Sequence, residues 1–229
     1  MAQRFIYGGL FAVVCLALIT IFLLKKFEKV EAVEVQGAIP EDAVIFAEDI
    51  DFEYLTETFL PENRIWIDFV NIMERKEADS LIFAVLAQVR SSEALHELLL
   101  NEGLNFSLHK VGKDQLIPVF YLEYAPTHGD KEFEHIILSM LDKQAMVNER
   151  KYEAEVVFDV SGGPGFVPGK FNFACLDGIC LISTSSMLVE ESIRTIHAEG
   201  NLAAEAGLQK VRATEGRYVH GNLFVNYER

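Results

Sequence analysis

The stretch Phe171-Asn-Phe-Ala-Cys-Leu-Asp-Gly-Ile-Cys-Leu-Ile-Ser183 decides the fold class. Two apolar runs flank Asp177-Gly178, a dipeptide typical of a two-residue β-hairpin turn. In the type I′ turn that this dipeptide favours, Cys175 stands opposite Cys180 in the closer kind of antiparallel pair, with Cα atoms about 4.5 Å apart. That separation lies within reach of a disulfide. We therefore expect an antiparallel hairpin, carrying a disulfide in an oxidising compartment or else a pair of buried thiols.

On both sides of this hairpin, the sequence contains patterns typical of strands and of helices. Strands are expected at 43–47, 106–109, 116–124, 152–160 and 222–227, where short β-branched or alternating runs occur. Helices are expected at 52–60, 133–141, 187–198 and 202–213, with two more within 65–100. This order predicts an α+β fold, a mainly antiparallel sheet with helices packed on one face.

The N-terminal residues have a different composition. Phe5 to Leu24 is a run of twenty residues without a charge, long enough as a helix to cross a bilayer core of about 30 Å. Two lysines follow it directly, instead of the small residues of a signal-peptide cleavage site. We therefore expect three parts: a transmembrane anchor in 1–26, a stalk in 27–39 and an extracytoplasmic α+β domain in 40–229. The final strand either completes the sheet or begins the next unit of a longer chain.

Charge narrows the choice of partners. The 229 residues include 20 Lys+Arg and 35 Asp+Glu, a net charge of −15, and every acidic residue lies after residue 26. Nucleic-acid binding needs a basic face, so this balance disfavours it. An acidic surface can steer a basic protein partner. The expected partners are the lipid bilayer, through Phe5 to Leu24, and another envelope protein.

Familiar catalytic and cofactor motifs are incomplete in this sequence. The glycine-rich loop at 161–171 has Pro164 and Phe171 where a phosphate-binding Walker loop needs Gly and Ser or Thr. His96-Glu97 begins like the helix of a zinc protease, but Leu100 occupies the position of the second histidine. We therefore expect no cofactor and no metal site.

One polar group is a candidate pocket. Ser107, His109 and Lys113 lie close together in the sequence, at an expected strand and the turn after it. If their side chains converge in a concave site, they can bind a ligand or perform acid-base chemistry. If they diverge on the surface, this hypothesis fails.

Three stretches carry a resemblance to a known family: Ile39-Pro-Glu-Asp-Ala43, Ser107-Leu-His109 through Gly112-Lys113, and Leu181 to Ile193. With these stretches the chain resembles a bacterial envelope family of membrane-anchored proteins of unknown function. The resemblance implies a single N-terminal anchor, an exported body and a longer parent chain. It implies no reaction and no catalytic residues.

Together these observations favour a non-enzymatic periplasmic interaction module or accessory subunit, tethered to the bacterial inner membrane. Two alternatives stay open. The first is a ligand-binding module or enzyme with a pocket near Ser107, His109 and Lys113. The second is an architectural repeat unit of a larger extracellular protein.

Overall fold

The computed structural model describes residues 33–59, 93–113, 115–124, 129–141, 145–162, 170–198, 206–214 and 219–226. The chain divides into two units, Met1–Glu31 and Ala32–Arg229, and all described residues belong to the second. The expected anchor, Phe5 to Leu24, lies outside the described residues. Within them, no helix combines the length and the apolar character needed to cross a membrane.

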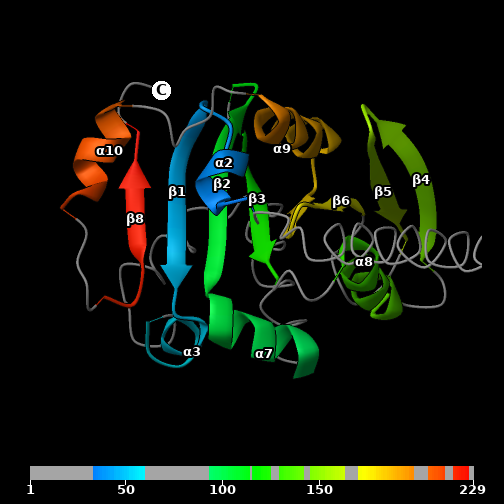
Figure 1. Ribbon diagram of the computed structural model, residues 1–229, viewed down its shortest axis with the longest axis horizontal. Helices are drawn as coiled ribbons and strands as arrows, with labels where there is room; N and C mark the ends of the chain where they lie inside the picture. The colour runs from blue at the N-terminus through cyan, green and yellow to red at the C-terminus, as the bar shows by residue number, and fades with distance from the viewer. Residues whose placement is uncertain are drawn as a thin grey trace, which may run out of the picture. The chain divides into compact units, whose positions relative to one another are not determined.

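A single antiparallel sheet runs through the described part of the chain (Figure 1). Its strand order is β4-β5-β6-β7-β3-β2-β1-β8, and each neighbouring pair is antiparallel. The strands are β1 Ala43–Ile50, β2 Leu104–Val111, β3 Gln115–Glu123, β4 Met146–Tyr152, β5 Glu155–Ser161, β6 Lys170–Leu176, β7 Ile179–Ser183 and β8 Asn222–Val225. The predicted antiparallel α+β fold is confirmed at this level.

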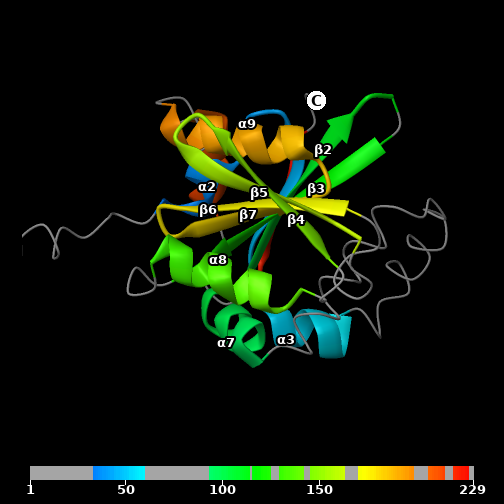
Figure 2. The same cartoon turned by 90° about the vertical axis from the view of Figure 1, so that its right-hand side faces the viewer.

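Helices cover both faces of the sheet, so the predicted packing on one face is wrong. They are α2 Val35–Ala38, α3 Phe52–Tyr54 with its continuation η1 Leu55–Phe59, α7 Glu93–Glu102, α8 Asp130–Ser139, α9 Ser186–His197 and α10 Ala206–Arg212. Figure 2 shows α2 and α9 on one side of the sheet and α3, α7 and α8 on the other. The central strands β6 and β7 are buried along almost their whole length. Such continuous apolar runs are typical of strands covered on both faces.

Two hydrophobic cores result, one on each face of the sheet. On the α8 face, the rings of Phe173 and Phe158 stack with their centroids 4.6 Å apart. On the α9 face, Tyr121 and Leu181 pack with Ile193 of α9. Because side chains alternate along each strand, neighbouring residues enter opposite cores.

The hairpin that decides the fold class forms as predicted. Asp177 and Gly178 have φ values of +50° and +86°, as a type I′ turn requires. The register places Cys175 opposite Cys180, with their Cα atoms 4.1 Å apart, and their sulfur atoms are joined in a disulfide. Both residues lie in the core of the α8 face.

The strand expected at 152–160 is confirmed from Glu155 onward as β5, but the prediction is wrong for its first residues. The strand β4 ends at Tyr152, Glu153-Ala154 forms a turn, and β5 starts at Glu155. Glu153 adopts a φ of +52°. The turn lacks the Gly, Asn or Asp that usually adopts a positive φ, so the sequence gives no local signal of a turn here.

The body begins earlier than Pro40. Val35, Ala38 and Ile39 are buried in the core of the α9 face, although the expected stalk covers 27–39. The backbone N–H of Val33 donates to the carbonyl oxygen of Asp177 at 3.0 Å. Residues 33–39 are therefore an integral layer of the body.

Candidate functional site

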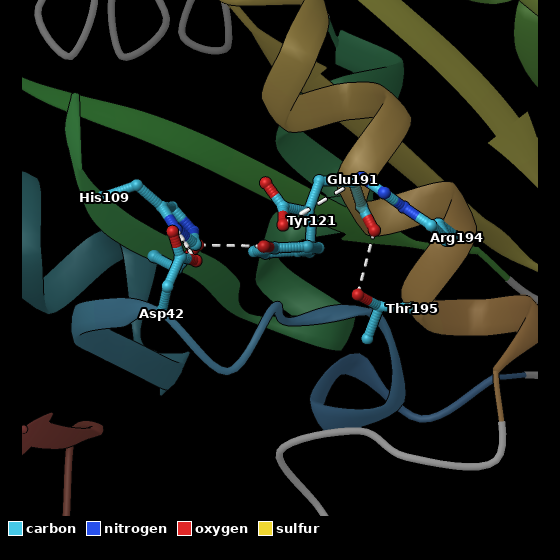
Figure 3. A network of polar contacts seen from close by, with 7 residues as sticks. Asp42, His109, Tyr121, Glu191, Arg194 and Thr195 are labelled. Atoms are coloured by element: carbon cyan, nitrogen blue, oxygen red, sulfur yellow. Dashed lines mark hydrogen bonds and ion pairs between the residues drawn. The ribbon is translucent and has the colours of Figure 1, made fainter. Parts of the chain in front are cut away.

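A row of four hydrogen-bonded side chains, which we call the polar network, crosses the α9 face (Figure 3). His109 Nδ1 lies 2.9 Å from Asp42 Oδ1, and His109 Nε2 lies 2.7 Å from Ser107 Oγ. Ser107 Oγ lies 2.8 Å from the hydroxyl of Tyr121. The structure thus brings Ser107 and His109 together, as the pocket hypothesis requires, and adds Asp42 and Tyr121.

Strand register positions each member of the polar network. Ser107 and His109 are two residues apart on β2, so both side chains leave the same face. Ala43 pairs with His109 across β1 and β2, and this pairing sets the preceding Asp42 beside the imidazole ring. On the other side, β3 carries Tyr121 to the Ser107 hydroxyl.

The hydrogen bonds of the polar network form a consistent chain of donors and acceptors. A neutral His109 that donates from Nδ1 to the Asp42 carboxylate has Nε2 free as an acceptor. The Ser107 hydroxyl can then donate to Nε2 and accept from the hydroxyl of Tyr121. Each buried polar group gains a partner, which offsets the cost of removing it from water.

The polar network is buried at its serine end and exposed at its carboxylate end, the opposite of what a serine hydrolase needs. The order Ser107, His109, Asp42 matches the order of a catalytic triad. However, Ser107, His109 and Tyr121 have relative exposures of 0%, whereas the side chain of Asp42 is 44% exposed. A serine nucleophile must reach its substrate, but here the carboxylate end meets solvent. Burial also raises the pKa of Tyr121 above its ordinary value of 10.0, which keeps the phenol protonated.

Lys113 does not join the polar network. It is exposed in the turn after β2, with Gly112 at a φ of +69°. It lies four positions after His109 and beyond the end of β2 at Val111. The predicted trio therefore divides into a buried pair and an exposed lysine.

The helix α9 packs over Tyr121 and covers this part of the α9 face. Leu188, Val189 and Ile193 of α9 belong to the same buried cluster as Tyr121. Figure 3 shows Glu191, Arg194 and Thr195 on this helix. The Thr195 hydroxyl donates to the Glu191 carbonyl oxygen at 2.8 Å, a contact within the helix. The Tyr121 end of the polar network is thus enclosed between sheet and helix, whereas the Asp42 end is exposed.

The strand β8, at the opposite end of the described sheet from β4, is a second candidate site. The Asn226 N–H donates to Val44 O at 2.8 Å, so alternation directs the backbone N–H and C=O groups of Leu223 and Val225 away from β1. The side chains of these two residues are 63% and 42% exposed. No charged residue occurs between Gly221 and Asn226.

Aromatic packing holds β8 to the sheet. Phe224 stacks on Phe46 of β1 with ring centroids 4.5 Å apart and an interplanar angle of 11°. Gly221 precedes the strand with a φ of +143°, and a Cβ there would lie 3.0 Å from the Cα of Ile50. Only glycine fits this close approach without displacement of the neighbouring backbone.

The edge strand β4 differs in its charge. Tyr152 and Glu155 flank a two-residue turn and therefore form a hydrogen-bonded pair. By alternation, the outward backbone groups of β4 belong to Val147, Glu149 and Lys151. Charged side chains of this kind protect a sheet edge from pairing with another strand.

Comparison with protein-family models, curated protein sequences and solved structures gives no match for this chain. The candidate sites therefore rest on their own geometry. The resemblance to membrane-anchored envelope proteins stays a prediction.

Proposed function

We propose that this chain is a non-enzymatic interaction module that pairs its edge strand β8 with a strand of an envelope protein. In this proposal residues 1–26 anchor it in the bacterial inner membrane and the body lies in the periplasm. The observation that carries the proposal is the uncharged outer edge of β8 within the described sheet, where Leu223 and Val225 are exposed and direct their backbone groups away from β1. Such an edge is a template for strand addition.

The disulfide supports the compartment. Cys175 and Cys180 are joined within the body, and structural disulfides persist in oxidising environments such as the periplasm. The buried position of Ser107 supports a non-enzymatic role, because a substrate would have to displace the covering core to reach it.

A matched pair of variants tests the edge. Val225→Lys and Val147→Lys place the same charge on β8 and β4, at side chains that are each 42% exposed. We expect Val225→Lys to abolish partner crosslinking of the full-length chain in its native membranes, while Val147→Lys retains it. Equal crosslinking by both variants and the wild type would overturn the assignment to β8. Thermal unfolding of both variants checks that each one folds.

A ligand-binding or hydrolytic pocket is the second candidate function, favoured by the triad order of Asp42, His109 and Ser107. It requires an opening of the α9 face that exposes the Ser107 hydroxyl. A fluorophosphonate probe should then label the wild type but not Ser107→Ala, with Ser183→Ala as a control for a second buried serine. Absence of labelling under conditions that label a known serine hydrolase would reject the hydrolase.

A further inference from the structure

We infer that the strand that pairs with β8 is the β8 strand of a second copy of this chain. This inference rests on the proposed function and names its partner. It follows from the self-complementary pattern of outward backbone groups on β8, and from the absence of charged residues on this strand.

The backbone pattern permits a symmetric antiparallel pair. Leu223 and Val225 direct their N–H and C=O groups outward, and Phe224 between them directs its own toward β1. A two-fold axis at Phe224 sets Leu223 of one copy opposite Val225 of the other, where each pair can exchange two N–H···O=C bonds. The two sheets then continue as one across the interface.

The side chains of β8 are also compatible with a two-fold axis at Phe224. Two Phe224 residues would face each other in the closer kind of antiparallel pair, with Cα atoms about 4.5 Å apart. Each Phe224 already stacks on Phe46 of its own copy. The interface therefore extends the aromatic row on the α9 face, and aromatic cross-strand pairs stabilise sheets.

The lack of charge on β8 favours a second copy over a basic partner. The chain has a net charge of −15, yet the strand and its flanks from Gly221 to Asn226 carry no charge. A basic partner would find no acidic side chain on this strand to bind, whereas two acidic copies can meet here without burying a charge. Mutual repulsion of the bodies then opposes association, and salt screens it. Self-association should therefore strengthen as salt increases.

Charged variants test this register directly. We expect the full-length wild type, purified in detergent, to show a concentration-dependent dimer by sedimentation velocity. Leu223→Glu and Val225→Lys should each weaken that dimer at least tenfold. An equimolar mixture of the two should restore dimers to within a few-fold of wild type, because the axis sets position 223 opposite position 225. Val147→Lys, on the other edge, should dimerise as the wild type does.

The outcomes separate self-pairing from the proposed function. A wild type that stays monomeric at all concentrations and salt levels overturns self-pairing, and so does a mixture that stays monomeric. If Val225→Lys still abolishes crosslinking to a different protein in membranes, β8 remains the docking strand with another partner. If the dimer forms but Val225→Lys and Val147→Lys affect it equally, the dimer interface lies elsewhere and self-pairing through β8 is overturned.

Discussion

The two outer strands of the sheet, β4 and β8, are held by different forces. Arg150 of β4 binds Asp159 of β5 through Nε at 3.0 Å and Glu190 of α9 through Nη2 at 2.7 Å. The strand β8 is held by the stacked rings of Phe46 and Phe224. The side-chain contacts that hold the two edge strands are therefore ion pairs in β4 and stacked aromatic rings in β8.

The same division appears on the solvent side of each strand. The outward residues of β4 include Glu149 and Lys151, whereas those of β8 are Leu223 and Val225. Charged edges resist pairing with another chain and uncharged edges permit it. In this sheet the strand with the uncharged outer side is also the one whose inner side is held by stacked aromatic rings.

The largest expected loss of stability comes from removing the ring of Phe224 in β8. Phe224→Ala removes a buried ring and its stacking on Phe46, which should cost about 3–5 kcal/mol of unfolding free energy. Denaturant unfolding measures this loss, and Phe224→Leu should recover most of it. An alanine variant as stable as the wild type would show that β8 contributes little to the fold.

A smaller loss of stability is expected from removing the ion pairs of Arg150 in β4. Arg150→Met leaves the half-buried carboxylates of Asp159 and Glu190 without this cation, which should cost about 1–3 kcal/mol. The loss should shrink when Asp159→Asn is combined with it, since one uncompensated charge is then removed. High salt should reduce the cost of Arg150→Met but leave that of Phe224→Ala unchanged. A salt-independent loss at β4 would contradict the distinction between the two edges.

The smallest effect concerns the polar anchor that precedes β8. Asp51 accepts from the Tyr54 N–H at 2.9 Å and contacts His220 Nδ1 at 3.0 Å. These contacts lower the pKa of Asp51 below its ordinary value of 3.8. The group therefore adds stability above pH 3.8, and that contribution is lost as the pH falls through the lowered pKa.

Asp51→Asn should remove this pH dependence. We expect a lower midpoint of thermal unfolding than the wild type at neutral pH, with the two values converging as the pH falls below 3.8. A difference that stays constant across this range would show that the charge of Asp51 does not contribute.

Local sequence signals predicted much of the fold. Asp177-Gly178 revealed the central hairpin because its positive φ angles belong to the type I′ turn. The repeat of apolar residues in 133–141 identified α8, whose buried side includes Phe133 and Ile137. The turn at Glu153-Ala154 was missed because its residue types do not favour a positive φ.

Contacts between distant segments could not be predicted in this way. Ser107 and His109 share one side of a strand by simple alternation, but Asp42 lies 67 residues from His109. It joins the polar network only through the register between β1 and β2. The place of β8 beside β1 is a similar case, because pairing between the two ends of the body leaves no local pattern.

The contact between Val33 and the β6–β7 turn also has a mechanical consequence. Part of any tension along the chain from the residues before Val33 would pass through its N–H bond to Asp177 O, at the turn of a hairpin closed by a disulfide. That hairpin lies in the middle of the sheet, where strands on both sides share the load. The covalent chain itself continues through α2 into β1, so a pull on the N-terminal segment would be divided between the central hairpin and the strand that pairs with β8.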